Sequence, residues 1–233
     1  MSQRLPLRAH FGESTRAVAA GNYTVYAYAI NAGPGNNQLI GTQQVSVAGD
    51  TLAPAVKTSA LPVYSLGKIA FRYAATDPGS GVASYDARYR TARYNGGYGG
   101  YGYPSSWQGS VATSRSFAPV RGSTYCFSVR ARDHAGNTSP WTADRCTAAP
   151  LDDRSLIRSA GWTLASNTAF YATTISIRAA AGGALTRTGI QARRLAIVAT
   201  KCRGCGTVGT YWNGTLLRQI SLNATTTAYR PGH

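Results

Sequence analysis

The chain has 233 residues, of which 43% are hydrophobic, and this is the proportion of an ordinary globular protein. It contains no run of about 18 apolar residues, so no membrane-spanning helix is expected. The formal net charge is +16, and 21 of the 24 basic residues are arginine. A basic surface attracts polyanions, but the arginines are scattered along the chain, which argues against a specific nucleic-acid footprint.

Residues 1–49 predict an incomplete β module. The run AGNYTVYAYAI (20–30) is rich in β-forming residues, NAGPGNN (31–37) is dense in turn formers, and LIGTQQVSV (39–47) predicts a second strand. Two or three strands are too few to bury a sandwich core. We therefore expect a broken domain, or one that packs on the next.

Residues 50–149 carry the clearest strand patterns. The segments 68–75, 84–90 and 123–133 alternate apolar and charged side chains, which is typical of half-buried antiparallel strands. The residues expected to face inward are Ile69, Phe71, Tyr73, Tyr85, Ala87, Tyr89, Tyr125, Phe127, Val129 and Ala131. Those expected to face outward are Lys68, Arg72, Asp86, Arg88, Arg90, Arg130 and Arg132. With a last strand that ends near Cys146, these segments predict one complete β-sandwich.

Residues 150–233 predict a third, incomplete β-sandwich. LDDRSLIRS begins with a short helical turn, TISIRA (174–179) alternates, and RLAIVAT (194–200) is apolar on both faces, as in a central strand. Residues 207–222 predict a hairpin, because Asn213-Gly214 suits a two-residue type I′ turn. The fold class is therefore all-β, with tandem antiparallel β-sandwiches whose terminal modules are incomplete.

The loop RYNGGYGGYGYPSSW (93–107) is the most suggestive feature of the middle region. It carries five aromatic side chains among five glycines. These are Tyr94, Tyr98, Tyr101, Tyr103 and Trp107. Aromatic rings in a loop on a rigid scaffold stack on sugar rings or on bases. The alternative is a low-complexity insertion that is solvated or folds onto its own sandwich.

The four cysteines predict two disulfides within domains, one between Cys126 and Cys146 and one between Cys202 and Cys205. Cys126 shares its parity with the outward arginines, so we expect the first bridge on the outer face, where it either ties adjacent strands or clamps the terminal strand. Cys202 and Cys205 form a lone CxxC with no second pair or nearby histidine, which does not provide the four ligands of a zinc site. A local disulfide between strands is expected, with a redox role as the alternative. Disulfides indicate an oxidising compartment. Since residues 1–14 lack an apolar signal peptide, we expect a fragment of a larger secreted or cell-wall-associated protein.

The acidic residues do not predict an active site. Asp77 and Asp133 lie in turns and are expected to cap backbone amides, and the adjacent Asp152 and Asp153 are expected to diverge. Glu13 is the sole glutamate, and no motif of hydrolases, metalloproteases or nucleotide-binding proteins appears with its supporting context. The sequence thus predicts no catalytic residue, cofactor or metal.

The stretch SGVASYDARYR, followed by TYCFSVRARDHAGNTSPWTADRC, resembles the fibronectin type III-like domains of secreted actinobacterial proteins. The preceding YTVYAYAINAGPGNNQLIGTQQVSV looks like the last strands of an Ig-like module from such proteins, although Tyr26 and Thr42 stand where those modules often have a disulfide. The resemblance implies domains of 1–49 (partial Ig-like), 50–149 (fibronectin type III-like) and 150–233 (partial β-sandwich). It implies no catalytic residues.

These observations predict a non-catalytic binding or spacer region that contacts cell-wall polymer or another polysaccharide mainly through the Tyr/Gly loop, with help from surface arginines. One alternative is charge-driven binding of a polyanion such as teichoic acid or nucleic acid. A second is a piece of a secreted hydrolase. The alternatives differ in salt dependence, because charge-driven binding weakens steeply with ionic strength.

Overall fold

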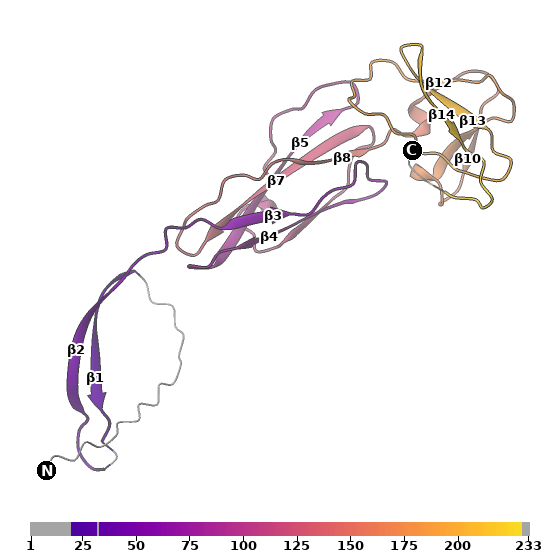
Figure 1. Cartoon of the computed structure of the whole chain (residues 1–233). Coiled ribbons are helices and arrows are strands. Elements are labelled where there is room, and N and C mark those ends of the chain that lie inside the picture. Colours follow the sequence, from indigo (N-terminus) through magenta and orange to yellow (C-terminus); the bar gives the residue numbers. More distant parts are fainter. Residues whose placement is uncertain (1–19, 32, 230–233) are drawn as a thin grey trace. The chain divides into compact units, whose positions relative to one another are not determined.

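The computed structural model describes residues 20–31 and 33–229. Within these residues the chain is all-β, with antiparallel sheets, three short 3-10 turns and no α-helix (Figure 1). The predicted fold class is confirmed in this respect. The chain divides into two compact units, of which the second begins at Ala53.

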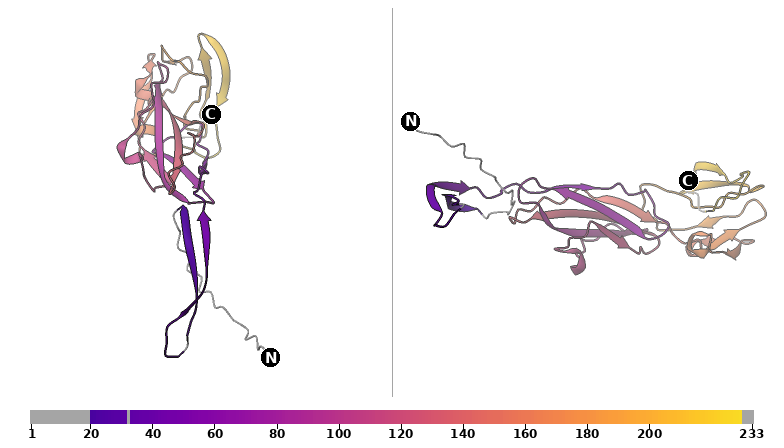
Figure 2. Two further views of the ribbon diagram at one scale, coloured as in Figure 1. Left: turned by 90° about the vertical axis from the view of Figure 1, so that its left-hand side faces the viewer. Right: turned by 90° about the horizontal axis from the view of Figure 1, so that it is seen from below.

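The first unit contains a two-stranded antiparallel ribbon. Strand β1 (Gly21–Ala29) pairs with β2 (Gln38–Val47), with a bulge between Ala27 and Tyr28 (Figure 2). Both predicted strands are present. None of the described residues of this unit, 20–31 and 33–52, is buried. The ribbon thus leaves its apolar side chains in solvent, as expected for two strands without a second sheet.

The second unit begins with two three-stranded sheets that enclose one core. The first sheet has the order β3 (Ala55–Thr58), β4 (Ile69–Thr76), β6 (Ser114–Phe117), and the second has β5 (Val82–Arg93), β7 (Ser123–Asp133), β8 (Arg145–Ala149). The core consists of Ile69, Phe71, Tyr73, Tyr85, Ala87, Trp107, Tyr125, Phe127, Val129 and Ala131, with Tyr89 packed against it. The stacked rings of Phe71 and Phe127 join the two sheets at 5.3 Å between centroids. The predicted inward faces are confirmed.

Tyr125 fixes the entry of the chain into β7. Its hydroxyl accepts a hydrogen bond of 2.8 Å from the backbone N–H of Val120, five positions upstream. The contact therefore holds the corner before β7 against the first part of that strand.

The predicted position of the last strand of the sandwich is wrong. The strand begins beside Cys146 rather than ending there, since β8 spans Arg145–Ala149. The segment before β8 lies beside β7 without a regular ladder of hydrogen bonds. It is held there by hydrogen bonds from Ser139 N to Ala131 O and from Thr142 N to Val129 O. Pro140 has no N–H to donate, which prevents a regular ladder there.

The third region consists of three two-stranded ribbons. The pairs are β9 (Ile157–Arg158) with β12 (Leu185–Thr186), β10 (Thr163–Ser166) with β11 (Thr174–Ile177), and β13 (Thr207–Trp212) with β14 (Thr215–Ser221). The predicted Asn213-Gly214 turn is confirmed, with φ of 49° and 80°. The prediction of a central strand at 194–200 is wrong, because these residues form no strand. An apolar run is buried on both faces only inside a wider sheet, and the described sheets here have two strands.

Asp152 joins this region to the sandwich. Its carboxylate caps the 3-10 turn η2 (Asp153–Ser155), the predicted helical turn, by accepting from Arg154 N. It also accepts from the side chain of Arg154 at 2.7 Å and from Arg121, which precedes β7, at 3.0 Å. These contacts, led by the Arg154 side chain, lower the pKa of Asp152 to about 2. Asp153 turns away toward Thr174 and Ser176, so the two carboxylates diverge as predicted.

Candidate binding surface

The Tyr/Gly loop runs back along β5 as an ordered segment. Gly99 N donates to Thr91 O at 3.0 Å, and Gly102 exchanges two backbone hydrogen bonds with Tyr89 at 2.7 and 3.1 Å. The loop therefore reaches the outer face of the sheet β5-β7-β8, which carries the outward arginines of β5 and β7. The alternative that the loop folds onto its own sandwich is correct for this part of it.

On that face, guanidinium groups and aromatic rings alternate in a continuous series that we call the arginine–aromatic stack. Its members, in order, are Arg130, Trp141, Arg88, Tyr101, Arg90 and Tyr98. The successive distances from guanidinium carbon to ring centroid are 4.8, 4.1, 3.7, 5.2 and 4.8 Å. Each is within the range of attractive cation–π contacts. The stack thus draws on β5, β7, the Tyr/Gly loop and the segment before β8.

Two aspartates hold the stack in register. Arg130 Nε donates to Asp86 Oδ2 at 2.9 Å, and the N–H of Gly109 donates to Asp86 Oδ1 at 2.8 Å. At the other end Asp144 accepts from Arg90 at 2.5 Å and from the hydroxyl of Tyr101 at 2.9 Å. Burial and the bond to Asp144 raise the pKa of Tyr101, so its hydroxyl remains a donor at neutral pH. The guanidinium charges of Arg90 and Arg130 are therefore partly neutralised in place.

Only two of the five predicted aromatic residues present substantial ring surface on this face. Tyr98 is 46% exposed and Tyr103 is 52% exposed, whereas Tyr101 lies between two guanidinium groups. The hydroxyl of Tyr103 accepts from Arg88 at 3.2 Å, and its ring meets Trp141 edge-on at 6.0 Å. Both exposed rings are thus fixed in orientation by the stack.

The predicted ligand contact of Trp107 is wrong. The residue belongs to the core, 9% exposed, where it packs against Tyr89, Phe117 and Phe127. The 3-10 turn Ser105–Trp107 at the end of the loop directs the indole inward. Its ring has no face left for a ligand.

Tyr94 lies apart from the other tyrosines of the loop. Its ring is stacked by Arg187 of the third region at 4.7 Å, and Arg187 also donates to its hydroxyl. Its backbone oxygen accepts from Gln191 N at 2.7 Å. Tyr94 thus helps to join the sandwich to the third region.

Sequence reasoning did not identify Trp141 or Asp144 as part of this surface. The outward parity of Arg88, Arg90 and Arg130 was visible in the alternation. Trp141 and Asp144 lie in the irregular segment before β8, where no periodicity assigns them to a face. Their role depends on long-range pairing that composition does not reveal.

Both predicted disulfides are present. Cys126 and Cys146 face each other across β7 and β8, so this bridge ties adjacent strands as expected. Cys126 is nevertheless only 1% exposed, because the loop covers it and the Tyr98 hydroxyl donates to its Sγ at 3.1 Å. Asp144 lies close to both sulfurs, but these are bonded to each other and are not available to a metal ion. Cys202 and Cys205 form the second bridge.

Asp77 and Asp133 cap their turns, as predicted. Asp77 Oδ1 accepts from Gly81 N at 2.8 Å, and Asp133 Oδ1 accepts from Asn137 N at 2.7 Å. These carboxylates stabilise backbone turns, which is the role expected of aspartates at such positions.

Comparison with known proteins does not assign the chain to a family. No family model matches the chain, and no curated protein matches it. Among the described residues there is no helix with the length and apolar character needed to cross a membrane.

Proposed function

We propose that this chain is a non-catalytic extracellular binding or spacer region of a larger secreted protein. Its sandwich would bind a cell-wall polymer or another polysaccharide through Tyr98 and Tyr103. The observation that carries the proposal is the pair of exposed rings held rigidly by the arginine–aromatic stack. Rings fixed before binding lose little conformational entropy when a sugar stacks on them.

The fold supports the extracellular part of this proposal. The strand order of the two sheets and the corner formed by Tyr125 resemble those of an immunoglobulin-class or fibronectin type III-like sandwich, which supports the proposal. Two disulfides suit a chain that folds in an oxidising compartment. Folds of this class carry many different functions, so the residues of the site and not the fold determine what is bound.

A neutral polymer fits this face better than a polyanion. The guanidinium group of Arg88 is covered on both sides by rings, and those of Arg90 and Arg130 are paired with Asp144 and Asp86. The exposed surface beside them consists of tyrosine rings and hydroxyls, which contact sugars through stacking and hydrogen bonds.

The test is retention of the purified chain on insoluble peptidoglycan, cellulose and chitin, at low and at moderate salt. We expect retention on at least one polymer that changes little with salt, and its loss in the double variant Y98A/Y103A. Tyr211→Ala is the matched control, because this tyrosine is 60% exposed on a strand of the third region. No retention on any of the three polymers overturns the proposal.

Charge-driven binding of a polyanion is the second candidate, and it is favoured by a different part of the chain. Residues 154–233 contain no aspartate or glutamate. Binding of teichoic acid or nucleic acid through this region would fall steeply with salt. It would also survive in Y98A/Y103A, so the same experiment separates the two candidates.

A further inference from the structure

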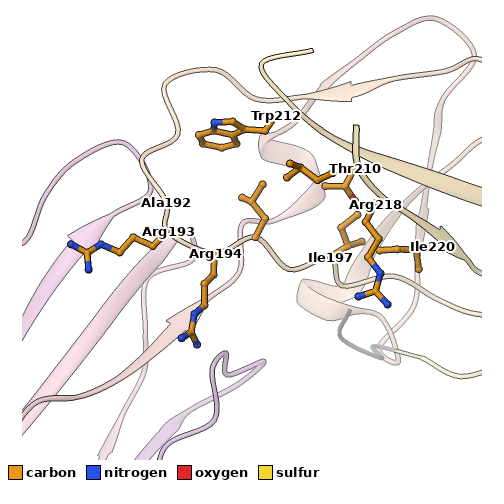
Figure 3. A pocket seen from close by; sticks show the side chains of 10 residues that line it. Ala192, Arg193, Arg194, Ile197, Thr210, Trp212, Arg218 and Ile220 are labelled. Carbon is orange, nitrogen blue, oxygen red and sulfur yellow. The ribbon is translucent and has the colours of Figure 1, made fainter. Parts of the chain in front are cut away.

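The third region contains a groove that the proposed polysaccharide contact does not use. It has a volume of about 440 Å³ and lies between residues 192–197 and the hairpin β13–β14 (Figure 3). Its apolar lining consists of Leu195, Ile197, Trp212, Leu217 and Ile220. Ligand pockets commonly measure about 300 to 1,000 Å³ and combine an apolar lining with a few polar groups. The volume of the groove lies within this range, and its lining combines apolar with polar side chains.

The lining also includes three arginines, Arg193, Arg194 and Arg218, together with Ala192 and Thr210. In Figure 3 the guanidinium groups of Arg194 and Arg218 project away from the indole of Trp212. None of the three forms an ion pair with another described residue. Among residues 20–31 and 33–229, the arginines with an ion pair are Arg90, Arg121, Arg130 and Arg154. Unlike the guanidinium groups of the stack, these are free to receive an anion.

The surrounding sequence supplies no competing carboxylate. Between residues 154 and 229 every ionised side chain is basic. These are Arg154, Arg158, Arg178, Arg187, Arg193, Arg194, Lys201, Arg203 and Arg218. A field of one sign raises the local concentration of anions. It also opposes pairing of this face with a second copy of the chain, which would bring like charges together.

We propose that the groove binds a hydrocarbon chain that ends in a phosphate monoester. The aliphatic side chains and Trp212 would cover the hydrocarbon, and the guanidinium groups would bind the phosphate through paired N–H donors, for which arginine is suited. Inorganic phosphate would leave the apolar lining exposed to water. A neutral hydrocarbon would leave the arginines without an anion.

The experiment is calorimetric titration of the full chain with octyl phosphate, inorganic phosphate, octanol and octanoate, all below micelle formation. Octyl phosphate is expected to bind at least tenfold more tightly than each of the other three. The variant R194A/R218A is expected to weaken octyl phosphate binding at least tenfold. The variant R203A, which removes an exposed arginine outside the groove, is expected to leave it within about twofold.

Three binding results would overturn the proposal. These are equal binding of octanol, octanoate binding as tight as that of octyl phosphate, and equal losses in R194A/R218A and R203A. Self-association that R194A/R218A abolishes would also overturn it, because the groove would then be an interface between copies. Both arginines of the double variant are exposed, so the fold is expected to persist, and an unchanged denaturation midpoint verifies this. The result of this titration is independent of retention on polysaccharide, because retention depends on Tyr98 and Tyr103 and not on the groove.

Discussion

The hydroxyl of Tyr101 donates a hydrogen bond of 2.9 Å to Oδ1 of Asp144, 43 positions away in the sequence. Asp144 lies directly before β8, and its other carboxylate oxygen meets Arg90 of β5 at 2.5 Å. One carboxylate therefore fastens the Tyr/Gly loop to the sheet from which the loop departs. The exposed rings on either side of Tyr101 depend on this attachment for their orientation.

Replacing Asp144 with alanine is expected to release the loop. The variant removes the acceptor of Tyr101 and the partner of Arg90. We expect a lower free energy of unfolding and faster hydrogen exchange at residues 96–103, because the loop loses both attachments. Amides of β13–β14 serve as the internal control. Unchanged exchange in the loop would show that the stack is held without Asp144.

Trp107 is expected to matter for stability and not for binding. Truncation of a buried tryptophan to alanine costs about 3 to 5 kcal/mol, so W107A should lower the denaturation midpoint strongly. W107F keeps an aromatic ring in the core, so this variant should be retained on the polymer as well as the wild type is. Retention that is lost in W107F at an unchanged midpoint would restore the ligand role predicted from the sequence.

The two disulfides are expected to differ in their effect on stability. In the chain-entropy model the stabilisation grows with the length of the closed loop, and gives roughly 3 kcal/mol for Cys126–Cys146 at a separation of 20 and roughly 2 kcal/mol for Cys202–Cys205 at a separation of 3. Urea denaturation of C126A/C146A and C202A/C205A compares them directly. Cys126 is also buried, so its removal leaves a small cavity that adds to the first loss. A larger loss for the second pair would contradict the model.

The Asp152 contacts are expected to make stability depend on pH in the acidic range. The pKa of Asp152 is lowered to about 2 in the folded chain, against about 3.9 in an unfolded one. Its contribution is therefore fully present above about pH 4 and is lost as the pH falls toward 2. We expect about 1 to 2 kcal/mol at neutral pH, because solvent screens the exposed ends of Arg121 and Arg154.

Urea denaturation of the wild type and D152N at several pH values between about 2 and 7 measures this contribution. The difference between the two proteins should be largest at neutral pH and should shrink below about pH 4. A difference that stays constant across this range would show that the carboxylate charge is not its source.

The strands and turns that depend only on neighbouring residues could be predicted from the sequence. Alternation along 84–90 placed Tyr85 and Ala87 in the core and Arg88 and Arg90 outside, because successive side chains of a strand point to opposite faces. Asn213-Gly214 predicted its turn since few other dipeptides adopt positive φ at both positions.

The candidate surface could be predicted only in part, because it depends on contacts between distant segments. The glycines of the loop 93–107 remove periodicity, so no rule separated Trp107, which enters the core, from Tyr98 and Tyr103, which remain at the surface. Trp141 joins the surface only because its segment follows β7 without regular pairing. The failure at 194–200 has the same origin, since burial of an apolar run depends on how many strands surround it.

The absence of acidic residues from 154–233 affects which part of the chain attracts negatively charged molecules. Every carboxylate side chain precedes Arg154, so most of the net charge of +16 lies toward one end of the sequence. A polyanion is therefore expected to be attracted more strongly to residues 154–229 than to the rest of the sequence, because local positive charge concentrates anions.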